Sequence, residues 1–181
     1  MLDKDIIEQT EKWIKQVVVD CNFCPFAAKA LLKKTIHYSV QSNLSEEESI
    51  AILEKEINYL NENDHLETSF IIFKNCFTNF DSYLKLVNKA ERWISKNKYD
   101  GIYQLASFHP DYCFEGSDDL DPANYTNRSI YPMLHLLRED SITKVLEFYK
   151  NPETIPHIEN AIAPNVIANG RFSLPMIMVK K

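Results

Sequence analysis

The chain has 181 residues, a length at which a single hydrophobic core is the usual arrangement, so we expect one domain over residues 1–181. Hydrophobic residues make up 45% and charged residues 25%, which excludes a disordered or fibrous chain. The formal net charge of −6 repels phosphate backbones, so nucleic acid is not an expected partner. This net charge does not exclude a local basic pocket.

The N-terminal part of the chain has the spacing of helices. Apolar residues recur every three or four positions from residue 3 to about residue 20, which predicts an amphipathic helix with one buried stripe. Pro25 suits a first helical position, so we expect a second short helix with Cys24 as its N-cap. The domain should therefore open with a helical pair.

Strand and helix patterns alternate through the middle of the chain. Residues 36–40 and the β-branched, aromatic run at 68–73 predict strands, as does the segment 102–108. A capping-box pair, Ser45 and Glu48, predicts the helix after the first strand, and periodic apolar residues over 79–97 predict the next. This order favours an α/β (or α+β) fold with a small, mostly parallel or mixed sheet covered by helices.

The C-terminal third is less regular. Residues 110–129 form a polar segment of about twenty residues, and a loop of that length in a compact domain is usually functional or disordered. It follows the strand ending at Phe108, and ligands in open α/β sheets gather beyond the carboxyl ends of strands. Residues 130–150, opened by Pro132, are predicted to be helical, and residues 176–179 could add an edge strand.

Familiar catalytic and targeting motifs are missing from the sequence. The three glycines are far apart, which excludes the phosphate-binding Walker A and GxGxxG loops, so no nucleotide cofactor is implied. The strings GxSxG and HExxH of α/β hydrolases and zincins are also absent. No apolar stretch approaches roughly 18 residues, and the charged N-terminus is unlike a signal peptide, so we expect a cytoplasmic protein with reduced cysteines and no membrane partner.

Cys24 is a candidate reactive thiol. At a helix N-terminus the positive end of the dipole lowers a thiol pKa, and Cys21 precedes it in a CxxC pair. A thioredoxin-like site would need a strand before the pair, whereas the preceding segment has helical spacing. Cys21 and Cys24 could instead bind zinc together with His109 and Cys113, or either could be a small buried residue.

Arg128, His135, Arg138 and Glu139 form a second cluster. His135 and Arg138 are three residues apart and would share one face of the predicted helix. Guanidinium groups beside an imidazole suit a carboxylate or phosphate, because arginine donates in a fixed fork. The alternative is a solvated helix face on which Arg138 pairs locally with Glu139.

Three strings carry a family resemblance: CPFA at residues 24–27, QLASFHPDY at 104–112 and NRSIYPMLHLLRE at 127–139. They resemble the bacterial family of unknown function called DUF1415, whose domain covers nearly the whole chain. The family pattern shares Cys24 but not Cys21 or Cys113, which implies that the zinc set and the CxxC pair are local to this chain.

The resemblance leaves a candidate site for a small anionic metabolite, held under the loop at 110–127, with hydrolysis or group transfer as a further possibility. The candidate roles are Cys24 as nucleophile, His109 and His135 as acid and base, Asp111 as the orienting carboxylate, and Arg128 and Arg138, with Asn127 and Gln104, as ligand-binding residues. The hypothesis requires the regions around His109 and His135 to meet in one concave site.

Two alternatives stay open. The first is a metal-binding module or metalloenzyme that uses His109 and His135 with nearby carboxylates from Asp111, Asp121 or Glu139. The second is a non-catalytic structural or partner-binding protein, which would expose an apolar patch. The sequence does not decide whether the protein is an enzyme.

Overall fold

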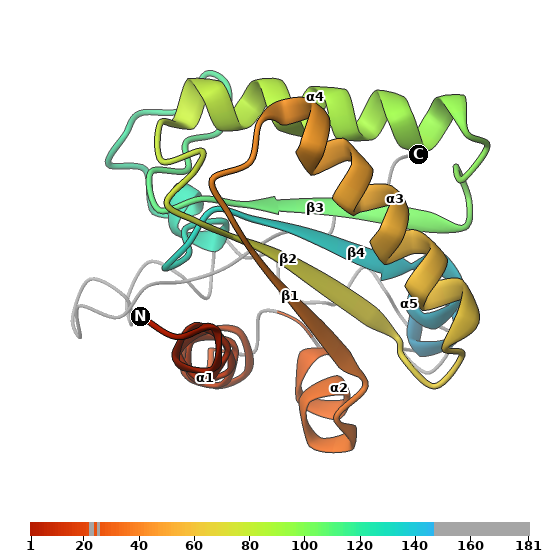
Figure 1. Ribbon diagram of the computed structural model, residues 1–181. Coiled ribbons are helices and arrows are strands. Elements are labelled where there is room, and N and C mark those ends of the chain that lie inside the picture. The colour runs from red at the N-terminus through yellow and green to blue at the C-terminus, as the bar shows by residue number, and fades with distance from the viewer. Residues whose placement is uncertain (22–23, 25, 147–181) are drawn as a thin grey trace.

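The computed structural model describes residues 1–21, 24 and 26–146 and has an α/β fold (Figure 1). Its helical elements are α1 (Asp3–Trp13), the π-helix η1 (Ile14–Val19), α2 (Ala27–Lys33), α3 (Glu46–Glu62), α4 (Phe80–Lys96), the 3₁₀-helix η2 (Pro122–Thr126) and α5 (Glu139–Leu146). Its strands are β1 (Ile36–Ser42), β2 (Thr68–Lys74), β3 (Tyr103–Phe108) and β4 (Met133–Arg138). Within the described residues, no helix is long and apolar enough to cross a membrane.

The four strands form one mixed sheet in the order β1-β2-β4-β3. β1 is parallel to β2, whereas β4 lies between β2 and β3 and is antiparallel to both. Helices α3 and α4 cover one face of this sheet, and α1 and α2 cover the other (Figure 1). The sheet is therefore a middle layer, with a separate hydrophobic core on each side.

β2 shows how the two cores divide. Successive side chains of a strand point to opposite faces. Ile71 and Phe73 accordingly pack in the core under α3 and α4, whereas Phe70 and Ile72 pack in the core under the N-terminal helices. Both faces are covered, which explains why residues 68–73 are buried without any alternation of polar and apolar side chains.

The predicted N-terminal helical pair is present, with different details. The first helix continues from α1 into the π-helix η1, so the helical path reaches Val19. The second helix begins at Ala27 with Phe26 as N-cap, so the prediction of Cys24 as the N-cap is wrong. The structure does not describe Pro25. A π-helical segment often marks a functional region, because it changes which side chains face a neighbouring cavity.

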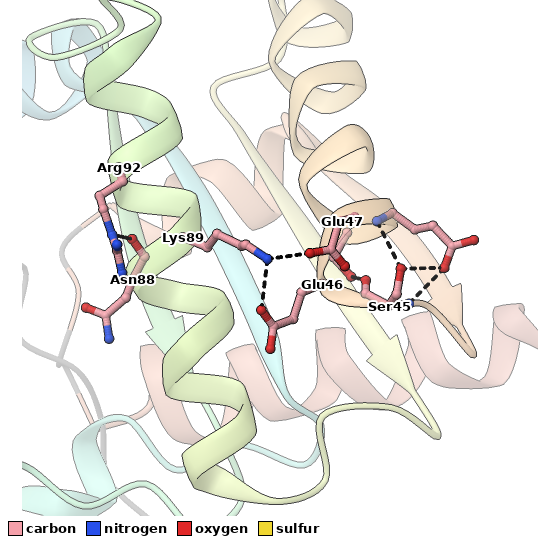
Figure 2. A network of polar contacts seen from close by, with 8 residues as sticks. Ser45, Glu46, Glu47, Asn88, Lys89 and Arg92 are labelled. Carbon is pink, nitrogen blue, oxygen red and sulfur yellow. Dashed lines mark hydrogen bonds and ion pairs between the residues drawn. The ribbon is translucent and has the colours of Figure 1, made fainter.

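The start of α3 follows the predicted capping box. Ser45 Oγ accepts a hydrogen bond of 3.2 Å from the Glu48 backbone N–H, and a Glu48 carboxylate oxygen accepts one of 2.8 Å from the Ser45 N–H. Lys89 of α4 reaches the same end of α3, with its Nζ 3.0 Å from Glu46 Oε2 and 2.6 Å from Glu47 Oε1 (Figure 2). These charges are solvent-exposed, so screening keeps their contribution to stability small.

The prediction of a helix over residues 130–150 is wrong for its first part, because residues 133–138 are strand β4 and a helix begins only at Glu139. β4 is the second strand from one edge and both its faces are covered, so its apolar run lacks the two-residue period of a half-buried strand. Such a run cannot be distinguished from a buried helix by spacing alone. Residues 147–150 and the edge strand predicted at 176–179 lie outside the described residues.

Candidate functional site

The two histidines on which the predicted site depends lie on opposite faces of the sheet. His135 shares a face of β4 with Met133, which packs in the core under α1. His109 follows β3 and contacts the rings of Phe80 and Tyr83 on α4, with centroid distances of 5.2 and 5.1 Å. The two imidazoles therefore do not form one site.

His109 is fully buried, and both ring nitrogens have partners. Nε2 lies 2.9 Å from the Phe77 carbonyl, and Nδ1 accepts a 3.0 Å hydrogen bond from the backbone N–H of Asp111. This pattern requires the hydrogen on Nε2. Burial is the main cause that lowers the pKa of His109, so the ring is neutral near pH 7. Its bonds join the 110–129 loop to the segment before α4.

Arg128 and Asn127 hold the 110–129 loop through hydrogen bonds to backbone carbonyls. Arg128 donates to the Tyr112 carbonyl at 3.0 Å and to the Asp119 carbonyl at 2.8 Å, and its guanidinium lies 4.4 Å from the centroid of the Tyr125 ring. The amide of Asn127 donates to the Ser107 carbonyl at 2.9 Å. These donors are already engaged with backbone oxygens.

Arg138 connects β4 to the end of α3. It donates to the carbonyls of Leu66, at 2.9 Å, and Leu60, and to the hydroxyl of Tyr103 at 3.2 Å. Because residues 135 and 138 belong to a strand, their side chains point to opposite faces, and the prediction that they share a helix face is wrong. Gln104, the remaining predicted ligand-binding residue, lies opposite Leu137 in the β3–β4 register.

The described residues do not assemble a metal site. Nowhere in the described ranges do three or more His, Cys, Asp or Glu side chains form a group that could hold a metal ion. Cys21 and Cys24 pack against the core under α1, whereas His109 lies on the α4 side. Cys113 stays within its own loop, 3.5 Å from the hydroxyl of Ser117.

A cavity of about 70 Å³ lies between the sheet and the N-terminal helices and brings together two of the predicted residues, Cys24 and His135. Its walls come from η1, α2 and the sheet face that carries Phe70 and Phe108. No charged side chain of the described residues lines it. An apolar cavity of about 150 Å³ can bind benzene or xenon, so this one has room for a xenon atom or a small organic group.

Cys24 is a neutral thiol in this cavity. Burial, the largest influence, raises its pKa, while hydrogen bonds from the backbone at Phe26 and Ala27 lower it less. The sequence predicted the opposite direction, because it placed Cys24 at the helix terminus and could not include the loss of solvent. A neutral thiol is a weak nucleophile.

His135 is also neutral, and its hydrogen position follows from its neighbours. Thr68 Oγ1 donates its single hydrogen to the Leu136 carbonyl at 2.5 Å and lies 2.5 Å from His135 Nε2. The hydrogen of the second contact must therefore belong to Nε2. The ring stacks on Phe70 at 3.8 Å, and burial lowers the pKa of His135 to about 3. Nδ1 is left as a hydrogen-bond acceptor.

Trp13 is a residue of the cavity that sequence analysis treated only as part of a buried helix stripe. Its side chain lines the cavity and is 6% exposed. The indole Nε1–H is buried and has no hydrogen-bond partner among the described residues. Such an orphaned donor is uncommon, because a buried polar group without a partner costs free energy. No signal in the sequence distinguishes this tryptophan from an ordinary core residue.

A second polar cluster, on the α3 side of the sheet, was not predicted either. Glu56 Oε2 accepts a 2.7 Å hydrogen bond from Ser69 Oγ and lies 2.9 Å from His37 Nδ1. His37 also lies against the ring of Tyr59, with centroids 4.4 Å apart. A glutamate within the apolar stripe of α3, and a serine within an apolar strand, were the available signals. The three polar side chains contact one another, and the cluster thereby connects β1, β2 and α3.

The comparisons with known proteins identify a family. The model of a family described as "Protein of unknown function (DUF1415)" matches residues 5–169. Neither the curated proteins nor the solved structures contain a match to the chain. Because the family model spans most of the sequence, the chain belongs to the DUF1415 family.

Proposed function

We propose that the protein binds a small, neutral and largely apolar molecule in the cavity lined by Trp13, Cys24 and His135. The observation that carries this proposal is the cavity of about 70 Å³ between the sheet and the N-terminal helices, whose described lining is mostly apolar. A small apolar ligand would cover these walls. We also propose that the protein works in the cytoplasm, which its four free cysteines support.

The anionic ligand expected from the sequence has less support at this position. A desolvated anion needs a cation or several donors, and no charged side chain of the described part of the chain lines the cavity. The guanidiniums of Arg128 and Arg138 already donate to backbone carbonyls elsewhere. His135 cannot replace them, because its low pKa keeps the ring uncharged near pH 7.

Binding is better supported than covalent catalysis. Nucleophilic attack by Cys24 requires the thiolate, and burial raises the pKa of this thiol. His135 is a poor base for removing the thiol proton, because its pKa is about 3. Hydrolysis or group transfer at Cys24 is therefore the second candidate, favoured only by the position of the thiol in the cavity wall.

Xenon is a suitable probe, because it occupies apolar cavities without any polar contact. Methyl NMR spectra recorded under xenon pressure should show shifts for Ile14, Val18 and Leu137, which line the cavity. In Ala106→Ile, whose larger side chain fills the cavity, these shifts should disappear. Ala51→Ile on the exposed surface of α3 is the control and should behave like the wild type.

Ala27→Val, on the α2 side of the cavity, provides a second filling variant if Ala106→Ile does not fold. Absence of xenon shifts in the wild-type protein would overturn the proposal. Equal shifts in the wild type and in a folded filling variant would overturn it too, because the xenon would then occupy another place.

A further inference from the structure

Glu56 and His37 form a carboxylate–imidazole pair on the face of the sheet opposite the cavity. His37 lies beside Ser69 in the parallel register of β1 and β2, and both side chains contact Glu56 of α3. The Glu56 side chain is 9% exposed, whereas the His37 side chain is 29% exposed. The pair therefore joins a buried carboxylate to an imidazole that reaches the surface.

The contact places the hydrogen of the neutral His37 ring on Nδ1. Nδ1 lies 2.9 Å from Glu56 Oε2, and an ionised carboxylate can only accept. Ser69 donates its single hydrogen to the same oxygen at 2.7 Å, so it has none left for Nδ1, which lies 3.4 Å from its hydroxyl. The lone pair of the ring is therefore on Nε2.

His37 Nε2 is accessible to solvent. Within the described part of the chain, the buried side-chain nitrogen and oxygen atoms without a hydrogen-bond partner are Trp13 Nε1 and Tyr38 Oη. His37 Nε2 has no partner among the described residues either, so it must reach solvent. The half-exposed ring of Tyr59 packs against the imidazole, with centroids 4.4 Å apart. Glu56 and Tyr59 thus hold the ring with its free nitrogen at the surface.

The other three described histidines lack this combination. In His109 and His135, Nε2 contacts a neighbour inside the fold, so its lone pair is not offered to solvent. His65 is exposed, but it forms no ion pair with any carboxylate of the described residues. His37 alone among these four combines a buried carboxylate at one nitrogen with an accessible lone pair at the other.

We propose that His37 is a nucleophilic modification site that accepts acyl groups from small activated donors, anhydrides and aryl esters, with Glu56 as its positioning residue. The Nε2 lone pair attacks the carbonyl carbon of the donor and forms a C–N bond. The bond from that carbon to the leaving oxygen breaks, and the oxygen departs with the electron pair. The ring, now positively charged, releases the Nδ1 proton to water through Glu56.

The buried carboxylate favours this step because positive charge develops on the ring as Nε2 is acylated. A hydrogen bond to an ionised acceptor is stronger than a neutral one, so the contact between Glu56 and Nδ1 strengthens toward the transition state. The site lies on the opposite face of the sheet from the cavity, and it does not depend on binding there.

Diethyl pyrocarbonate is the probe, since it is an anhydride that acylates neutral imidazoles. It transfers an ethoxycarbonyl group to the nitrogen and releases ethyl carbonate, which decomposes to ethanol and carbon dioxide. Digestion and mass spectrometry after timed reaction of the folded protein at pH 8 give a rate for each histidine. His37 should react faster than His65, although His65 is the more exposed. A slower reaction at His37 would overturn the proposal.

Glu56→Gln tests the positioning role, because the amide oxygen can still accept from Nδ1 but carries no negative charge. The rate at His37 should fall about tenfold, while the rate at His65 in the same sample stays unchanged. Ser69→Ala is the matched control, since it removes the other contact of Oε2 and keeps the charge beside His37. Its rate at His37 should stay close to that of the wild type.

A purely structural role of Glu56 predicts a different result. Loosening of the fold would expose His37 in both variants and raise its rate, so a faster or unchanged reaction in Glu56→Gln would overturn the proposal. If Glu56→Gln does not fold, ¹⁵N NMR of the wild-type protein decides. A neutral His37 with its hydrogen on Nδ1 would support the proposal, and one with its hydrogen on Nε2 would overturn it.

Discussion

Thr68 Oγ1 lies 2.5 Å from His135 Nε2, and this contact joins two adjacent strands beneath the N-terminal helices. It holds a neutral, largely buried imidazole, and burial lowers the pKa of His135 to about 3. The histidine is therefore an acceptor in the wall of a cavity and cannot act as a cation near pH 7. Lowering the pH should therefore destabilise the folded domain.

Between pH 6.5 and pH 3, the unfolded chain should bind a proton at His135 that the folded chain does not bind. The stability contributed by the neutral ring is thus complete above pH 6.5 and decreases as the pH falls. At pH 5 the loss should be about 2 kcal/mol, from about 1.4 kcal/mol per pH unit. Urea denaturation at pH 7 and pH 5 should show that His135→Gln loses less stability than the wild type. Equal losses in both proteins would contradict the assignment.

Arg138→Leu should destabilise the domain, because it removes the guanidinium that donates to the Leu66 carbonyl and one of the two donors to the Leu60 carbonyl, which also accepts from the Asn63 N–H. We expect a decrease of about 2–3 kcal/mol in the free energy of unfolding, as for buried acceptors that lose a charged donor. Arg92→Leu is the control. Arg92 is exposed on α4, and its only hydrogen bond among the described residues goes to the carbonyl of Asn88 in its own helix (Figure 2), so its loss should change stability by less than about 0.5 kcal/mol. Similar effects of the two substitutions would show that Arg138 has no special structural role.

Alkylation of Cys24 should be slow in the folded protein. Because burial raises the pKa of this thiol above its ordinary value of 9.0, the thiolate fraction at any neutral pH is lower than in the unfolded chain. The rate of reaction with iodoacetamide, followed by mass spectrometry of the Cys24 peptide, should rise with pH along a curve displaced to higher pH relative to the protein in urea. The same linkage makes the folded state lose stability as the pH rises above 9.0. A fast reaction at pH 7 in the native protein would instead support the nucleophile predicted from the sequence.

Glu56→Gln should weaken the tie between α3 and the sheet. Ser69 and His37 both contact the same carboxylate oxygen, Oε2, and the side chain is 9% exposed. An amide oxygen could replace it as acceptor but would lack the negative charge that strengthens both hydrogen bonds. We expect a loss of about 2 kcal/mol in the free energy of unfolding, measured by urea denaturation. Glu54→Gln, two residues earlier on the exposed side of α3, should have almost no effect. If both variants were as stable as the wild type, the cluster would contribute nothing measurable.

The sequence alone was sufficient where the signal is local. The capping box of Ser45 and Glu48 and the helical spacing over 79–97 are properties of neighbouring residues. α3 has the predicted N-cap, and α4 begins and ends within one residue of its predicted bounds. The alternation of strands and helices up to Phe108 also predicted the α/β class, because a sheet covered by helices needs that order.

Tertiary structure alone decided the conformation of residues 133–138 and the surroundings of Cys24. An apolar run of that length fits a helix or a doubly covered strand equally well, and its place between β2 and β3 made it a strand. Because these residues form a strand, the side chains of His135 and Arg138 point to opposite faces, and His135 lines the cavity together with Cys24 and Trp13. The pKa values of these side chains depend on how much water the surrounding elements exclude, which is a property of packing between distant segments and is absent from local sequence patterns.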